Sequence, residues 1–165
     1  MKQRLGILSD THLTQVDSLF KKKIRHCFDD CQVIIHAGDL TAPSLLEALS
    51  HKTLYAVHGN MCNQDLHGQL PRQRSFTLGG FSFGLIHGDG LGHDIESRLW
   101  DIFPEADCVI YGHTHRAVCH TVAGRLIINP GSFRDTGRFG APGTYAVVDI
   151  DEALHGRICR VPAYL

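Results

Sequence analysis

The chain has 165 residues, of which 43% are hydrophobic and 20% charged, and its formal net charge at pH 7 is −1. This length and composition predict one globular domain over residues 1–165, and the near-neutral charge gives no overall positive field that would attract nucleic acid. The first apolar run is too short for a signal peptide, and no stretch is long enough to span a membrane. We therefore expect a cytoplasmic protein without a membrane anchor.

The first part of the chain alternates predicted strands and helices. Apolar residues at three- and four-residue intervals from Val16 to Phe28 predict an amphipathic helix. A second helix is expected after Thr41, which can cap it, with Pro43 in its first turn. Three short buried strands are predicted, at residues 3–9, 33–35 and 54–57.

After Pro71 the pattern changes to pairs of strands. Gly79-Gly80 and Ala123-Gly124 each lie between two strand-like runs, which is typical of a β-hairpin. Ile95, Leu99 and Ile102 predict a helix that ends before Pro104. The expected strands of this part are residues 75–78, 81–86, 108–111, 117–122, 125–128, 144–150 and 157–162.

The six cysteines include no Cys-x-x-Cys pair. Cys27 and Cys31 are spaced as neighbours on a helix, and Cys108 and Cys119 fall in apolar runs. These positions predict buried free thiols rather than a disulfide framework or a structural zinc site.

Polar side chains follow five of the predicted strands. One His-x-His pair alone would be compatible with ordinary surface histidines, but polar donor residues recur after strands at intervals of 21 to 27 residues. Each interval is about one strand with its return connection, so we expect the strand ends to meet at one edge, where ligands bind in α/β proteins. The residues concerned are Asp10, His12, Asp39, Asn60, His87, His113 and His115.

Seven nitrogen and oxygen donors at one edge are unfavourable unless a cation neutralises them. Imidazole, carboxylate and amide groups suit divalent first-row metals, and a pair of ions with Asp39 as the bridge would use all seven residues. We expect Mn²⁺ first, with Ni²⁺, Zn²⁺, Fe, Co²⁺ or Mg²⁺ as alternatives. Because paired ions clamp the attacking and leaving oxygens in phosphoryl displacement, the sequence predicts phosphoester hydrolysis.

The ordered motifs Asp-x-His, Gly-Asp, Gly-Asn, His-Gly and Gly-His-x-His resemble those of the calcineurin-like metallophosphoesterases. The length and the Asn129-Pro130-Gly131-Ser132 turn are similar to those of small phosphodiesterases of the YfcE/MJ0936 type. The resemblance implies an α/β fold in four layers, an α/β/β/α sandwich with two central mixed β-sheets. It also implies a phosphodiesterase whose metal-bridging hydroxide attacks phosphorus in line. Relatives often form homodimers or homotetramers.

The resemblance implies a role for each motif residue. Asp10, His12 and His115 would bind the first ion, and Asn60, His87 and His113 the second, with Asp39 bridging. Asp39, Asn60 and His87 are thereby the expected catalytic residues, and Asn60 would also hold a phosphoryl oxygen.

The sequence departs from the family pattern after Gly59-Asn60. Met61 replaces a histidine of larger relatives, so the expected proton donor for the leaving group is missing, which favours acidic leaving groups. Cys62 is a candidate pocket residue, with a buried thiol as the alternative. Arg134 and Arg138, in a glycine-rich loop, are candidate contacts to a substrate phosphate, with solvated loop arginines as the alternative.

The rival hypothesis is a non-catalytic protein-binding scaffold, because Vps29 resembles the same fold. All seven donor positions are retained here. This favours an enzyme, whose partner is a phosphoester substrate, over a protein-binding scaffold.

Overall fold

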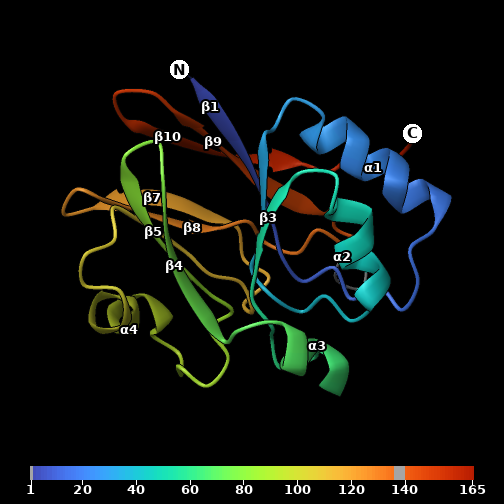
Figure 1. Ribbon diagram of the computed structural model, residues 1–165, viewed down its shortest axis with the longest axis horizontal. Coiled ribbons are helices and arrows are strands. Elements are labelled where there is room, and N and C mark those ends of the chain that lie inside the picture. The colour runs from blue at the N-terminus through green and yellow to red at the C-terminus, as the bar shows by residue number, and fades with distance from the viewer. Residues whose placement is uncertain (1, 136–139) are drawn as a thin grey trace.

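The structure is a computed structural model that describes residues 2–135 and 140–165 (Figure 1). Two five-stranded sheets form its centre. In the first sheet β1 runs parallel to β2, and β2 runs parallel to β3, whereas β9 is antiparallel to both β1 and β10. Its strands, in spatial order, are β10 (Leu154–Arg160), β9 (Thr144–Ile150), β1 (Gln3–Leu8), β2 (Val33–His36) and β3 (Thr53–Ala56).

The second sheet is also mixed. β5, β6 and β8 are parallel to one another, and the antiparallel strands β4 and β7 form its two edges. The strands in spatial order are β4 (Gln73–Leu78), β5 (Phe81–Ile86), β6 (Cys108–Ile110), β8 (Arg125–Asn129) and β7 (Val118–Val122).

Helices cover the outer faces of both sheets. Figure 1 shows α4 on the opposite side of the molecule from the other three helices. The helices are α1 (Ser18–Phe28), α2 (Pro43–Leu49), α3 (Gln64–Gln69) and α4 (Ile95–Ile102). The expected four-layer α/β/β/α sandwich is thus confirmed.

Buried strands supply side chains to both of their faces. In β2, Val33 and Ile35 pack between the two sheets, and Ile34 points outward into the core beneath α1 and α2. Successive strand residues point to opposite faces, so a strand covered on both sides is apolar throughout. This explains why the strands carrying the motifs read as continuous apolar runs.

The two hairpins are confirmed. Gly79 and Gly80 have φ values of +57° and +86°, and Ala123 and Gly124 have +48° and +80°. Two successive residues with positive φ make the tight turn that matches the twist of paired strands.

Three local predictions were incomplete or wrong. Helix α3 was not expected, although Asn63 caps it by accepting a hydrogen bond from the Leu66 amide at 3.0 Å. Thr41 does not cap α2: Ala42 is the capping residue, and the Thr41 hydroxyl donates to the Leu13 carbonyl instead. The last strand comprises Leu154–Arg160 rather than 157–162, because the short turn at Asp151 brings β10 directly back onto β9.

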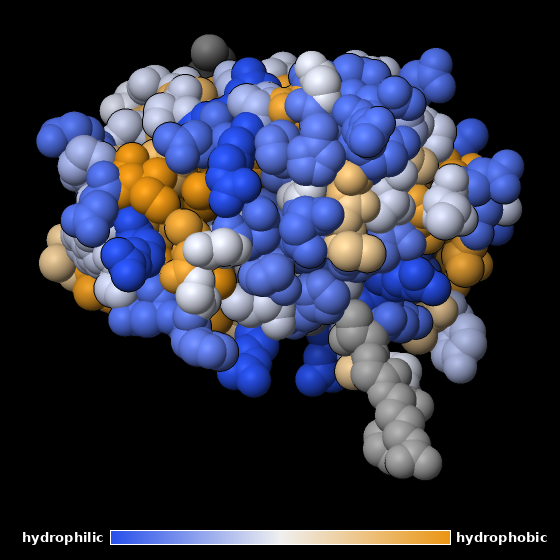
Figure 2. Space-filling model, turned by 90° about the horizontal axis from the view of Figure 1, so that it is seen from below, coloured by the Kyte–Doolittle hydropathy of each residue, from blue (hydrophilic) through white to orange (hydrophobic). Residues whose placement is uncertain are grey.

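The surface shown in Figure 2 is mainly hydrophilic, with hydrophobic side chains in separate groups. Within the described residues, no helix has the length and apolar character that crossing a membrane requires.

Lys52 closes the C-terminal end of α1. Its Nζ donates to the carbonyl oxygens of Phe28, Asp29 and Cys31 at 2.7, 2.8 and 2.6 Å. The last carbonyls of a helix have no partner within the helix, and the helix dipole favours a positive charge beside them.

We predict that Lys52→Met lowers the free energy of unfolding by about 1 to 3 kcal/mol, because three carbonyl groups lose a charged donor. Urea unfolding followed by circular dichroism measures this change. Lys22→Met is the matched control, since Lys22 is an exposed lysine on the same helix. Equal stability of the two variants would contradict the role given to Lys52.

Candidate metal centre

The motif residues gather where strands of both sheets end. Asp10 and His12 follow β1, and Asp39 follows β2 in the first sheet. In the second sheet His87 directly follows β5, and His115 follows β6. The sandwich therefore brings together donors from two sheets.

The backbone of these loops adopts an uncommon conformation. Among the described residues, six that are not glycine have a positive φ, and five of the six are predicted metal ligands. Such backbone costs free energy and concentrates at functional sites. The five are Asp10 (+54°), His12 (+44°), Asp39 (+57°), His113 (+69°) and His115 (+58°).

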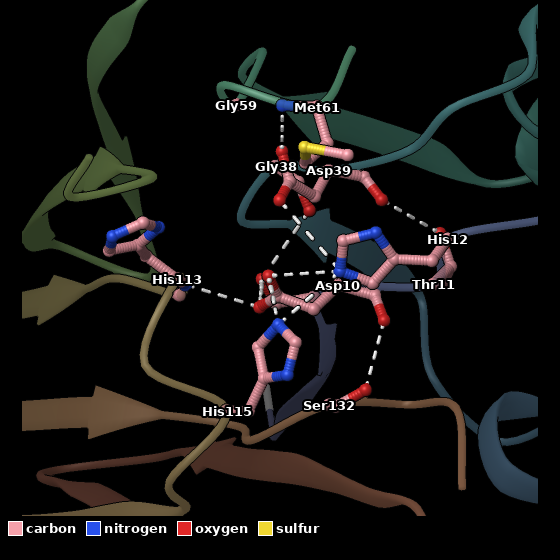
Figure 3. A network of polar contacts seen from close by, with 12 residues as sticks. Asp10, Thr11, His12, Gly38, Asp39, Gly59, Met61, His113, His115 and Ser132 are labelled. Atoms are coloured by element: carbon pink, nitrogen blue, oxygen red, sulfur yellow. Dashed lines mark hydrogen bonds and ion pairs between the residues drawn. The ribbon is translucent and has the colours of Figure 1, made fainter. Parts of the chain in front are cut away.

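Asp10, His12 and His115 form one group of potential ligands. The Oδ1 atom of Asp10 lies 3.2 Å from Nε2 of His115 and 3.7 Å from Nε2 of His12. The two Nε2 atoms are 3.3 Å apart. Figure 3 shows both imidazoles directed at the Asp10 carboxylate. This is the group expected for the first ion.

Asp10, Asp39 and His87 form a second group. Nε2 of His87 lies 3.3 Å from Oδ2 of Asp39 and 3.9 Å from Oδ1 of Asp10. Nδ1 of His87 lies 2.7 Å from the Ala37 carbonyl oxygen, which can only accept, so Nδ1 carries the proton. In the neutral imidazole, Nε2 then has a free electron pair facing the two carboxylates.

Burial and ion pairing act in opposite directions on the pKa values of the site. Burial alone would raise the pKa of Asp10, but His115 and His12 hold it below the usual carboxyl range. Burial likewise opposes ionisation of Asp39, and the interaction with His87 offsets it, so the pKa of Asp39 is also lowered. Both acids are therefore anionic near neutral pH although almost completely buried.

The same contacts act on the imidazoles. The neighbouring Asp10 carboxylate raises the pKa of His115. Burial alone would lower the pKa of His87, but Asp39 and Asp10 raise it above the ordinary histidine value. The site thus stabilises positive charge beside its carboxylates.

Two buried atoms of the site have no hydrogen-bond partner, and they are Oδ1 of Asp10 and Nε2 of His87. Unpaired buried polar atoms are costly and uncommon in folded proteins. An oxygen anion and an imidazole electron pair that face the same space are both metal ligands. The residues present therefore fit a bound divalent ion.

Three surrounding residues that the sequence did not single out as site residues hold the ligands in place. Ser9 donates its hydroxyl to Oδ2 of Asp10 at 2.6 Å. Ser132 donates to the Asp10 carbonyl at 3.0 Å, and Asn129 donates to the Gly112 carbonyl at 2.9 Å. The Asn-Pro-Gly-Ser turn was visible in the sequence as a turn, but nothing in the sequence showed what it contacts.

Two glycines allow the loops to approach the carboxylates. A Cβ atom on Gly112 would lie 2.1 Å from the Ser9 hydroxyl and 3.0 Å from Oδ2 of Asp10. A Cβ atom on Gly59 would lie 2.2 Å from Oδ1 of Asp39. Larger residues at either position would displace a carboxylate.

His113 and Asn60 lie at the edge of the two groups. The backbone amide of His113 donates to Oδ2 of Asp10 at 3.2 Å, and Figure 3 shows its ring turned away from that carboxylate. The ring packs edge-on against His87, with 5.2 Å between centroids. Asn60 is exposed, and the next residue, Met61, donates its amide to Oδ1 of Asp39 at 2.8 Å.

The three candidate substrate contacts have different surroundings. Cys62 is buried, accepts a hydrogen bond from the Gly59 amide and donates to the Leu40 carbonyl, which favours the buried-thiol alternative. Arg134 is exposed and donates to the His12 carbonyl at 3.0 Å, beside the site. Arg138 lies outside the described residues.

His36 acts within the protein structure. It is fully buried, and its Nδ1 accepts a hydrogen bond from the Gly38 amide at 3.2 Å. Burial lowers the pKa of His36 to about 3. A neutral His36 therefore supports the loop that carries Asp39.

The fold is an α/β/β/α sandwich, and its strand ends carry two candidate metal-binding groups. The family model of the calcineurin-like phosphoesterase superfamily domain matches residues 3–153. The chain belongs to this metal-dependent superfamily, which confirms the resemblance seen in the motifs.

Similar proteins agree with this assignment. A probable metallophosphoesterase of Methanothermobacter thermautotrophicus is 36% identical over 132 residues, which cover 78% of this chain and 76% of that protein. The phosphodiesterase MJ0936 of Methanocaldococcus jannaschii is 29% identical over 147 residues, covering 78% and 82%. The structure of vacuolar protein sorting 29 from Cryptosporidium parvum has a TM-score of 0.75 at 17% identity, covering 96% and 97%, and shares the fold.

We predict that Gly112→Ala weakens Mn²⁺ binding by about tenfold or more, because the new methyl group displaces Ser9 from Asp10. Isothermal titration calorimetry measures the affinity. Gly68→Ala is the control, since a Cβ atom there meets no atom within 4 Å. Unchanged Mn²⁺ affinity in a folded Gly112→Ala protein would show that close approach at Gly112 does not shape the site.

Proposed function

We propose that the protein is a phosphodiesterase that uses two divalent ions. The proposal rests on the buried carboxylates of Asp10 and Asp39, which face imidazoles. Two buried atoms there, Oδ1 of Asp10 and Nε2 of His87, have no hydrogen-bond partner. Asp10, His12 and His115 would hold one ion, and Asp39 and His87 the other. The family pattern implies that Asn60 and His113 would also bind the second ion.

The chain fixes the orientation of each carboxylate before any ligand arrives. Ser9 and the His113 amide bind Oδ2 of Asp10, which leaves Oδ1 directed into the site. The Met61 amide binds Oδ1 of Asp39, which leaves Oδ2 beside His87 and, at 3.8 Å, near Nε2 of His12. This position between two imidazoles of different groups is compatible with Asp39 as the bridging ligand that the family pattern implies. Oδ1 of Asp10 also lies within 3.9 Å of imidazoles of both groups.

Bound divalent ions would supply an activated water as nucleophile and would neutralise charge on the phosphoryl group. The protein residues contribute fixed anionic and imidazole groups on strand ends, so little reorganisation is needed on binding. Mn²⁺ is the first ion to test because the oxygen and imidazole donors suit it.

The residue after Asn60 determines whether a side chain at this position can protonate the leaving group. The Met61 side chain is 57% exposed and carries no transferable proton. An alcohol that leaves as a stable anion needs no protonation, and this supports esters with acidic leaving groups as substrates.

A protein-binding scaffold is the second candidate. The fold shared with vacuolar protein sorting 29 favours it. Asp10 and His87 are fully buried and lack partners on one side, which supports a metal centre. The relative that is 36% identical is named a probable metallophosphoesterase, and this supports the enzyme over the scaffold.

We expect the Mn²⁺-loaded protein to hydrolyse bis(p-nitrophenyl) phosphate, and Asp39→Asn to lower kcat/KM by about 100-fold or more, since it removes a charged ligand. Release of p-nitrophenolate measures the rate, and the same assay with Ni²⁺, Zn²⁺, Co²⁺ and Mg²⁺ ranks the ions. Asp101→Asn, at an exposed position of α4, is the control. A protein that binds metal but shows no hydrolysis of diesters or monoesters would favour the scaffold.

A further inference from the structure

Two cavities are lined by residues of the loops that carry the predicted metal ligands. One includes Thr11, which stands between the ligands Asp10 and His12. The other includes His113 and Thr114 of the Gly-His-x-His loop. Figure 3 shows Thr11 and His113 on opposite sides of the Asp10 carboxylate. A phosphoryl group at the metal centre would therefore have a cavity on each side.

The first cavity, which we call the apolar pocket, has a volume of about 360 Å³. Its walls are the apolar side chains of Leu13, Leu19, Phe20 and Phe133. An apolar cavity of about 150 Å³ already accommodates a benzene molecule, so one aromatic group fits here.

Charged residues of both signs complete the lining of the apolar pocket, and they are Asp17, Lys23, Arg134 and Asp135. The Arg134 guanidinium donates a 3.0 Å hydrogen bond to the His12 carbonyl, which places it beside a predicted metal ligand. A guanidinium at this position can bind an anionic phosphoryl group whose apolar substituent lies in the pocket.

The second cavity, which we call the polar pocket, has a volume of about 530 Å³. His93, Glu96, Thr114 and Arg116 line it with donors and acceptors. The Glu96 carboxylate is fixed in place, because the Tyr111 hydroxyl donates to Oε1 at 2.9 Å and His120 Nε2 lies 2.9 Å from Oε2. Hydrogen-bond donors and acceptors in fixed positions suit a substituent rich in hydroxyl groups.

We infer that the substrate is a phosphodiester with two unlike substituents, an aromatic group in the apolar pocket and a hydroxyl-rich group in the polar pocket. This inference rests on the proposed function and narrows its substrate class. A monoester has one organic substituent and would leave one pocket empty, whereas a diester fills both.

Binding of phosphonates to the Mn²⁺-loaded protein tests the pockets without hydrolysis. Methyl-, phenyl- and 2,3-dihydroxypropylphosphonate share a head group and differ only in the substituent. We expect the phenyl compound to bind about tenfold more tightly than the methyl compound, because it buries an aromatic ring. Isothermal titration calorimetry measures the three dissociation constants.

Two variants separate the pockets. Leu19 is 43% exposed and lines the apolar pocket. In Leu19→Gln, phenylphosphonate should lose most of its higher affinity over methylphosphonate, whose own binding should stay the same. Arg116→Gln should weaken dihydroxypropylphosphonate about 3- to 10-fold and leave phenylphosphonate unchanged. Val122→Thr, at an exposed position of β7, is the control and should alter none of the three.

Each result bears on one proposal. Equal binding of the phenyl and methyl compounds, or a phenyl advantage that survives Leu19→Gln, would overturn the role of the apolar pocket. An unchanged dihydroxypropyl affinity in Arg116→Gln would overturn the role of the polar pocket. If Mn²⁺ binds but none of the phosphonates does, the phosphoesterase proposal itself fails.

Discussion

The structure depends on one electrostatic constraint, the burial of the Asp10 and Asp39 carboxylates at the same point. Both are almost inaccessible to solvent, and among the residues that the structure describes it is imidazoles that face them. Buried anions are tolerated only where charge or hydrogen bonds compensate for lost hydration. Ser9, the Met61 amide and the histidines supply part of that compensation, and a cation would supply the rest.

The sandwich architecture makes this arrangement possible. A single parallel sheet presents its strand ends along a line, whereas two packed sheets present theirs around a shared space. β1 and β2 of one sheet bring Asp10 and Asp39, and β5 of the other brings His87. The loops after β1, β2 and β6 take left-handed backbone conformations at five predicted ligands. The core between the sheets holds these loops in strained conformations.

The layered fold was predicted from the resemblance to the metallophosphoesterases. The meeting of the strand ends was predicted from apolar runs and strand-end motifs, which are local signals. Asp10, His12, Asp39, His87 and His115 do lie together. Contacts between distant segments left no local signal: Asn129 and Ser132 look like an ordinary turn, yet they bind the Gly112 and Asp10 carbonyls. Helix α3 was missed because its six residues are too few to show a period, and Thr41 had a tertiary partner in Leu13.

Two neighbouring groups of side chains are expected to hold one divalent ion each. Anomalous scattering from Mn²⁺-soaked crystals locates such ions. We expect two anomalous peaks, one contacting Asp10, His12 and His115 and the other contacting Asp39 and His87. Crystals that contain Mn²⁺ but show no peak at these side chains would contradict this expectation.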